Sequence, residues 1–258
     1  MSAWDAWIGR EEVRHDSLGT ALVQRWCATL DRDAPEGGAV PQGLHWCLCV
    51  PDAPTARLGD DGHPARDDSP ESFLPPLSLP RRMWAGGEVT FLEPLLPDDP
   101  VQKTSTIREI LWKTGRTGAL CFVAVEHDYR TPRGVAIREI QNLVYRPAAT
   151  ASAPVAAPSA VQHFDREWQV PIDPVLLFRY SAVTFNGHRI HYDQGYAQQV
   201  EHYAGLVIHG PLQATLLADL AQRQLGKPLT SFDFRGQMPA FDGVTLHVCG
   251  DVTDTGAS

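Results

Sequence analysis

Residues 207–221 read Val-Ile-His-Gly-Pro-Leu-Gln-Ala-Thr-Leu-Leu-Ala-Asp-Leu-Ala, and this pattern predicts a buried central helix around which a fold can be built. Pro211 suits the first helical turn because it lacks an N–H that would have no partner there. Gly226 followed by Pro228 marks the end of the helix. Its apolar face is broad and consists of Leu212, Leu216, Leu217, Leu220 and Ala221.

The first half of the chain combines one helical pattern with several strand patterns. Apolar residues recur near helical spacing over residues 17–31, which predicts an amphipathic helix with Asp16 or Ser17 as its N-cap. Gly115 to Gly118 supplies a hairpin turn between two of the expected strands. The segments that alternate or are rich in β-branched residues are 89–92, 104–113, 119–127 and 135–145. One helix against an antiparallel sheet is therefore expected.

The second half repeats this combination more compactly. Apolar stretches at 168–170 and 176–180 precede a short helical pattern at 193–200, and the long helix follows. Strands are expected at 231–236 and 244–248, with no further strand after them, so the last strand of the second unit is expected to be missing. Two halves of this kind predict a duplicated α+β unit.

Two irregular segments divide the chain. Residues 147–160 contain three prolines but no charge and no aromatic residue, which predicts an extended linker between a domain at 1–146 and a domain at 161–258. The stretch 51–80 is rich in Pro, Asp and Gly and includes Gly59-Asp-Asp-Gly-His-Pro64. A loop of that length inside a domain is usually either functional or disordered.

The composition limits the classes of function. The chain has 258 residues, 43% of them hydrophobic, which supports a real core. Its formal charge of -9 argues against a nucleic-acid partner, because no basic stripe is present to replace phosphate counterions. We expect a soluble cytoplasmic protein, because no apolar run is long enough to span a membrane and no secretory signal opens the chain. Five cysteines without a Cys-x-x-Cys pair indicate reduced, packed thiols.

Residues 185–193, Phe-Asn-Gly-His-Arg-Ile-His-Tyr-Asp, are the segment most suited to chemistry. His188 and His191 can move a proton near neutral pH, and the N–H of Gly210 at the start of the long helix can hold developing negative charge. The alternative is structural, since such histidines often line a polar wall or cap a helix. On that reading His209 bonds the loop and Gly210 serves only the turn.

Together these motifs resemble the MaoC-like enoyl-thioester hydratases and dehydratases, which have the hot-dog fold. The first half, through Trp7-Ile-Gly-Arg10, Leu79-Pro-Arg-Arg-Met-Trp-Ala-Gly-Gly87 and Val144-Tyr-Arg146, is similar to the partner domain of mesaconyl-C4-CoA hydratases and mitochondrial-type hydroxyacyl-thioester dehydratases. The resemblance implies a double hot-dog fold in which the first unit is non-catalytic and the second is catalytic.

The family pattern is Asp-x-Asn-Pro-x-His, and this chain departs from it. His191 falls on the catalytic histidine and His188 on the asparagine, while Asn186 replaces the aspartate and Arg189 replaces the proline. An amide cannot act as a general base, so the resemblance implies that His191 is the principal base. Asn186 would then orient the water, and the N–H of Gly210 would bind the thioester oxygen.

Substrate-binding residues follow from the same resemblance. Arg81, Arg82 and Lys113 are candidates for the phosphates of coenzyme A, because guanidinium forks match phosphate oxygens. Trp84 is a candidate for the acyl or pantetheine channel, and Arg189 or Arg179 for a distal carboxylate. His209 completes the predicted binding set. The alternative is that the cations are solvated surface charges and that the tryptophan only packs.

We therefore predict a hydro-lyase that adds water reversibly to an α,β-unsaturated acyl-CoA thioester, with mesaconyl-C4-CoA converted to citramalyl-CoA. Itaconyl-CoA hydration, 3-hydroxyacyl-acyl-carrier-protein dehydration and a non-catalytic thioester-binding role remain alternatives. Coenzyme A enters as part of the substrate, and no cofactor is expected. No metal is expected either, because the histidine spacing matches no zinc pattern such as His-Glu-x-x-His. A homodimer is left open.

Overall fold

The computed structural model describes residues 4–35, 38–115, 118–148, 164, 166–253 and 256–257. All but the first two residues of the expected linker at 147–160 lie outside these ranges. The division into domains at 1–146 and 161–258 therefore stays a prediction.

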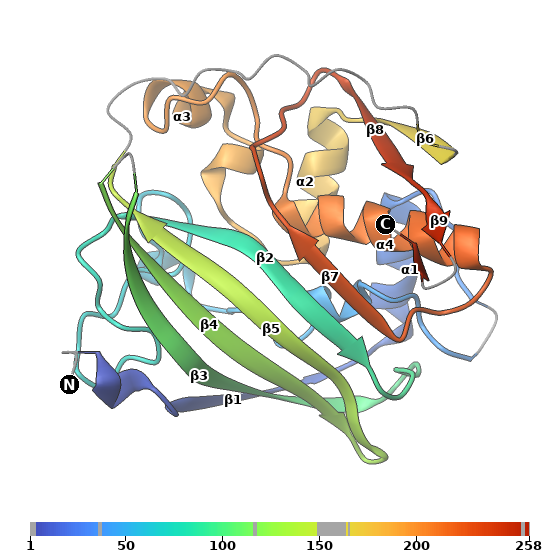
Figure 1. Cartoon of the computed structure of the whole chain (residues 1–258), viewed down its shortest axis with the longest axis horizontal. Helices are drawn as coiled ribbons and strands as arrows, with labels where there is room; N and C mark the ends of the chain where they lie inside the picture. Colours follow the sequence, from blue (N-terminus) through green and yellow to red (C-terminus); the bar gives the residue numbers. More distant parts are fainter. Residues whose placement is uncertain are drawn as a thin grey trace.

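Six antiparallel strands form the main sheet, in the order β1-β3-β4-β5-β2-β7 (Figure 1). Their bounds are β1 Glu11–Ser17, β2 Arg81–Phe91, β3 Pro100–Gly115, β4 Gly118–Thr131, β5 Gly134–Arg146 and β7 Ser231–Arg235. All four strands expected in the first half are confirmed, and the pairing of Gly115 with Gly118 fits the expected hairpin. Strand β1 was not predicted, because its sequence is mostly polar and largely exposed.

Strand β7 belongs to the second half of the chain but extends the sheet of the first. It pairs with β2, where Gly86 faces Arg235 and Gly87 faces Phe234. A side chain at Gly86 would place its Cβ 2.4 Å from the carbonyl oxygen of Phe234, so the close approach of the two strands requires glycine. The sheet is thus continuous across the two halves.

The remaining strands are short. β6 (Arg166–Pro171) pairs with β8 (Thr245–Gly250), and β9 (Val252–Thr253) pairs with β10 (Gly256–Ala257). The expectation that no strand follows residue 248 was therefore wrong. Strand β8 continues to residue 250, and two paired strands of two residues each, β9 and β10, come after it. Alternation of side chains is too brief in β9 and β10 to be read from sequence.

Four α-helices accompany the sheet: α1 Thr20–Thr29, α2 Pro174–Val183, α3 Gln194–Gln199 and α4 Gly210–Leu225. Helix α4 ends at Gly226 with a left-handed φ of 64°, as predicted, and α3 confirms the short helix expected near 193–200. The expected start of α1 was wrong, because Asp16 and Ser17 end strand β1 and do not cap a helix. A carboxylate oxygen of Asp16 instead accepts from the N–H of Cys49 (2.8 Å).

One core joins the helices of both halves to the sheet. Trp26 of α1, Leu177 of α2 and Leu212 of α4 are fully buried in the same cluster as Val89 of β2. Burying a large apolar side chain contributes roughly 1.5–3 kcal/mol, so this shared cluster holds α1 and α4 together (Figure 1). The central role predicted for α4 is confirmed.

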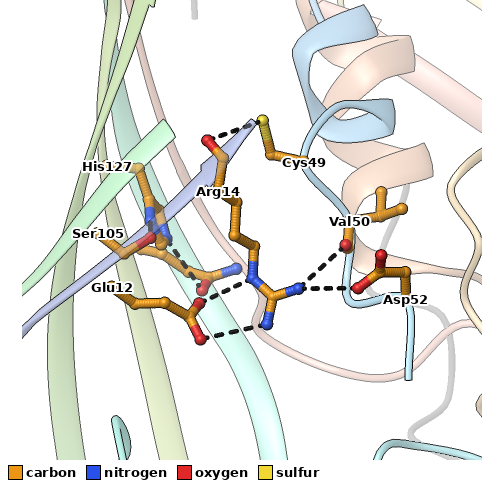
Figure 2. Close-up of polar contacts among 8 residues, drawn as sticks. Glu12, Arg14, Cys49, Val50, Asp52, Ser105 and His127 are labelled. Atoms are coloured by element: carbon orange, nitrogen blue, oxygen red, sulfur yellow. Dashed lines mark hydrogen bonds and ion pairs between the residues drawn. The ribbon is translucent and has the colours of Figure 1, made fainter. Parts of the chain in front are cut away.

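The long irregular stretch 51–80 is ordered, because arginines hold its backbone. Arg14 of β1 pairs with Glu12 and Asp52 and donates to the carbonyl of Val50 (3.3 Å), which fixes the beginning of the stretch (Figure 2). Arg66 donates to three carbonyls near its end, those of Leu77, Leu79 and Pro80. Arg10 donates to the carbonyls of Pro70 and Ser72. The loop is therefore held at several points along its length.

The described part of the chain also contains four short 3-10 helices: η1 Asp5–Trp7, η2 Leu44–Cys47, η3 Thr55–Arg57 and η4 Arg189–His191. All five cysteines are free thiols, four of them buried, as expected for packed reduced cysteines. No helix among the described residues is long and apolar enough to cross a membrane.

Glu139 of β5 is a carboxyl group buried in the core of the first half. It accepts a hydrogen bond from the indole N–H of Trp46 (3.1 Å) and is 1% exposed. Burial raises its pKa to about 7, against the opposing effects of Trp46, Lys103 and Tyr129. Nε2 of His45 lies 3.7 Å from Glu139, but burial lowers the pKa of His45 to about 3, so the pair is not ionic at neutral pH.

Replacing Glu139 with Gln tests this buried group. The folded carboxyl resists ionisation until about pH 7, whereas an unfolded glutamate ionises near its ordinary pKa of about 4.3. Wild-type stability therefore loses the Glu139 contribution as pH rises between those values. We expect the unfolding free energy of Glu139→Gln, relative to wild type, to rise over this range in urea titrations. Parallel pH profiles for the two proteins would contradict the assignment.

Candidate active site

The histidine-rich segment forms a tight loop between α2 and α3. Phe185 leaves α2 with a φ of 50°, and the N–H of Asn186 donates to the carbonyl of Ser181 (2.8 Å). The side-chain oxygen of Asn186 accepts from the backbone N–H of His188 (3.0 Å), which closes an Asx turn. The turn occupies this oxygen, so the amide NH2 group is the part of Asn186 left to orient a water.

His191 is buried and has a defined tautomer. Its Nδ1 lies 2.6 Å from the carbonyl oxygen of Val207, and because a carbonyl only accepts, the proton resides on Nδ1. Nε2 therefore carries the lone pair. Burial lowers the pKa of His191 to about 4, although the bond to Val207 favours the charged ring. The imidazole is neutral at pH 7 and can accept a proton through Nε2.

His209 lies behind His191 and supports it. The two rings stack with centroids 3.7 Å apart, and Nε2 of His209 lies 2.8 Å from the hydroxyl of Ser181. His209 is 1% exposed, and burial lowers its pKa well below the ordinary value. The stacking places His191 beside the N-terminus of α4, because His209 precedes that helix directly.

Gly210 is the first residue of α4 and is exposed. No atom outside its immediate neighbours lies within 4 Å of the position that a Cβ would occupy. A backbone N–H at a helix N-terminus is oriented to bind negative charge, and here no side chain obstructs it. The helix terminus can therefore accommodate a developing oxyanion close to His191.

Further imidazoles continue the row that begins with His209 and His191. His188 meets His191 edge to face, with centroids 5.5 Å apart. The next ring belongs to His63, whose centroid lies 4.1 Å from that of His188. Burial lowers the pKa of His188, and the neighbouring charges of His63 and His191 lower it further. The row thus joins the second half of the chain to the long loop of the first.

His63 comes with its own carboxylate. Its Nδ1 lies 2.9 Å from one side-chain oxygen of Asp61, and its backbone N–H donates to the other oxygen (3.0 Å). Burial opposes ionisation of Asp61, but the hydrogen bonds and charge of His63 outweigh it and lower the pKa of Asp61. Neither residue was singled out from the sequence. The available signal was their place in a long Gly- and Asp-rich loop.

A backbone contact joins the two loops. A Cβ on Gly62 would lie 2.0 Å from the carbonyl oxygen of Gly187, and a Cβ on Gly187 would lie 2.6 Å from that of Gly62. Beside this contact, the backbone N–H of Arg189 donates to the carbonyl of Asp61 (2.8 Å). Only glycine at both positions allows this approach, so the pair fixes how His63 lies against His188.

Asp61, His63 and His188 also define a cluster with donor atoms within 4.8 Å of one another. Two imidazoles and a carboxylate are chemically suitable for a divalent cation. However, Nδ1 of His63 is hydrogen-bonded to Asp61, so two of the three possible metal ligands already have each other as partners. The expectation that the protein needs no metal stays a prediction.

The histidine row, the helix terminus and the loop lie within the region recognised by a known family. Residues 43–242 match hydroxyacyl-thioester dehydratase type 2. The chain belongs to this family. This match confirms the resemblance of the sequence to hydratases and dehydratases of thioesters.

Two relatives extend the match over almost the entire chain. Mesaconyl-C(4)-CoA hydratase of Chloroflexus aurantiacus is 43% identical over 249 residues, covering 93% of this chain and 85% of the relative. The mitochondrial hydroxyacyl-thioester dehydratase type 2 of Schizosaccharomyces pombe is 26% identical, covering 95% of this chain and 90% of the relative. Membership in the dehydratase family therefore involves both halves.

Solved structures agree on the fold. A MaoC-like dehydratase superposes with a TM-score of 0.71 at 14% identity, covering 95% of this chain and 88% of its own. A Mycobacterium tuberculosis protein described as a double hot-dog fold superposes with a TM-score of 0.56 at 12% identity, covering 97% and 87%. The predicted α+β double hot-dog class is confirmed for this family member.

Two residues predicted to bind substrate make close contacts within the protein. Arg189 donates to Asp193 (2.7 Å) and to the carbonyl of Asp60 (2.9 Å), and its guanidinium lies over the ring of Tyr196. These contacts fasten the histidine loop. His209 is buried behind His191 and stacks on its ring. The binding roles of both residues stay predictions.

The other predicted binders lie on the sheet. Arg81 pairs with Glu201 (3.0 Å), and Trp84 packs edge to face against Trp46 and Phe234. Lys113 is exposed on β3, with its ammonium over Phe122. Arg82 differs from them, because its charge lowers the pKa of His188. Of the four, Arg82 is the one that the structure brings toward the histidine row.

Two surface hollows do not coincide with the histidines. One of about 570 Å³ is lined by Arg66, Asp68, Pro76, Leu77, Ser78 and Pro80. Another of about 390 Å³ lies between α1 and α2 and is mostly apolar. Neither hollow is lined by a histidine, so the histidine row is a candidate active site on the arrangement of its side chains alone.

Replacing Gly62 with Ala tests the contact between the loops. The substitution adds a Cβ against Gly187 and strains a residue with a φ of +87°. Gly9→Ala is the matched control, since Gly9 has a φ of +83° but open space around it. Backbone strain alone costs about 1–3 kcal/mol. We expect Gly62→Ala to lower the melting temperature more than the control and to speed amide exchange at residues 186–191. Equal effects would contradict the contact.

Proposed function

We propose that the protein is an acyl-CoA hydratase that adds water to mesaconyl-C4-CoA and forms citramalyl-CoA. The observation that carries the proposal is the 43% identity, over 93% of the chain, to a mesaconyl-C(4)-CoA hydratase. The histidine row supports it, because hydration of a conjugated thioester needs a base for water and donors for the enolate-like oxygen.

His191 is the proposed base. Its Nε2 takes a proton from water while the water oxygen attacks the β-carbon of the enoyl-thioester. The tautomer that this requires is the one that Val207 imposes through Nδ1. Asn186 orients the water with its amide NH2 group, and the dehydration reaction uses the same groups in reverse.

The N–H of Gly210 is the proposed donor to the thioester oxygen. Charge moves onto that oxygen as the β-carbon is attacked, and a helix N-terminus stabilises it without reorganisation. Nothing in this step calls for a redox or metal cofactor, since water addition transfers one proton and one hydroxyl group.

Arg82 is the proposed partner for the substrate carboxylate. In mesaconyl-C4-CoA the carboxylate is bonded to the carbon that water attacks, so its cation has to lie near the base. Arg82 influences His188 and has no carboxylate partner among residues 4–35, 38–115, 118–148 and 166–253. Arg189, predicted for this role from the sequence, is paired with Asp193.

Turnover of enoyl-thioesters tests the proposed function. We expect the purified protein to remove the conjugated absorbance of mesaconyl-C4-CoA faster than that of crotonyl-CoA, and to form citramalyl-CoA from it faster than from itaconyl-CoA when the product is measured by chromatography. His191→Ala removes the base and should lower kcat by roughly 10²–10⁴-fold. Absence of turnover with all three thioesters, or full activity in the His191 variant, would contradict the proposal.

Substrate selection tests Arg82 separately. A hydrogen bond to a charged group contributes about 1.5–3 kcal/mol, so Arg82→Gln should raise KM for mesaconyl-C4-CoA by about tenfold to a hundredfold. Crotonyl-CoA lacks the carboxylate and should be affected much less. Arg166→Gln, at an exposed position on β6, is the control. An equal loss with both substrates would exclude a carboxylate role for Arg82.

A further inference from the structure

The Asp61–His63 pair has no role in the reaction as described so far. It belongs to the long loop of the first half, yet its ring packs on His188 with centroids 4.1 Å apart. The Gly62–Gly187 contact and the bond from the N–H of Arg189 to Asp61 hold it there. Two independent backbone contacts thus place a carboxylate and an imidazole against His188, whose ring in turn meets that of the proposed base His191.

Within the histidine loop, residues 185–193, no carboxylate is hydrogen-bonded to an imidazole as Asp61 is to His63. The family pattern to which the loop is similar has an aspartate at position 186, and this chain has an asparagine there. The amide is neutral and its oxygen is held by the N–H of His188. A carboxylate reaches the row from the other half instead, through Asp61, whose two oxygens both bond to His63.

The electrostatics divide the two imidazoles between acid and base. Nδ1 of His63 lies 2.9 Å from a carboxylate oxygen of Asp61, whereas Nδ1 of His191 lies 2.6 Å from the carbonyl oxygen of Val207, so only the first ring has an anion beside it. Positive charge on His63 lowers the pKa of both His191 and His188. A proton on His63 therefore disfavours one on His191, and groups separated in this way are suited to opposite roles.

Building on the hydratase function, we propose that His63 is the second acid–base residue of this site and that Asp61 positions it. As Nε2 of His191 takes a proton from water and the oxygen bonds to the β-carbon, the electron pair of the double bond moves toward the thioester. The His63 imidazolium then gives its proton to the α-carbon. His191 afterwards releases its proton to solvent and His63 regains one, so that the net change is addition of one water.

Charged groups around His63 define what a pH profile reports. The carboxylate of Asp61 lies against the ring of His63, and His188, His191 and the guanidinium of Arg82 belong to the same group of charges around the row. In the hydration direction the enzyme needs His191 neutral and His63 protonated. The rate should therefore fall at low pH through His191 and at high pH through His63, giving a bell-shaped profile.

The test compares kcat/KM against pH for wild type, His63→Asn and Asp61→Asn, with mesaconyl-C4-CoA. His63→Asn should lower kcat by roughly 10²–10⁴-fold and abolish the high-pH limb while the low-pH limb remains. Asp61→Asn, which conserves shape, should move the high-pH limb to lower pH because the imidazolium loses its anion. His247→Asn is the control, because His247 forms a comparable pair with Glu167 away from the site.

Each other outcome counts against the pair. Unchanged activity, or a loss of kcat with both limbs intact in variants of native melting temperature, would overturn an acid–base role. Loss of wild-type activity on chelation and its recovery with Zn²⁺ would assign Asp61, His63 and His188 to a metal instead. An inactive wild type would overturn both proposals, whereas an active wild type with an indifferent His63 variant would overturn only this one.

Discussion

The backbone contact between Gly62 and Gly187 fixes how the histidine loop lies against the long loop of the first half. Two loops, one from each half, approach so closely that the carbonyl oxygen of each glycine leaves no room for a Cβ on the other. Arg189 secures the contact through its own N–H and through its guanidinium, which donates to Asp60 and Asp193. Since the loop of the first half is itself held by Arg10, Arg14 and Arg66, the geometry of the histidine row depends on contacts far from it.

The row has little charge of its own. His188, His191 and His209 are all held neutral by burial, which keeps lone pairs available but makes an imidazolium costly. A nearby anion offsets that cost, and Asp61 supplies it from the other half. The first unit of the double hot-dog is thus more than a cover for the second, because it brings a carboxylate to the histidine row as well as part of the shared core.

Sequence periodicity predicted the regular helices and strands, but it did not predict the features that depend on contacts between distant parts of the chain. Helix α4, its glycine stop and the strands β2 to β5 follow from apolar spacing and turn residues. Strand β1 was not predicted because its side chains are mostly polar, and its stability comes from pairing with β3. His191 was singled out through a local motif, whereas Asp61 lies in an irregular loop more than a hundred residues earlier. The ion pair of Arg189 with Asp193 at i+4 was visible in the sequence but was not considered there.

A structure of the protein with citramalyl-CoA bound would test the central claim most directly, which is that one site assembled from both halves performs the hydration. We predict Nε2 of His191 within about 2.7–3.2 Å of the tertiary hydroxyl, the thioester oxygen on the N–H of Gly210, and the ring of His63 facing the α-carbon. A thioester bound in the apolar hollow between α1 and α2, with the histidine row empty, would contradict the account.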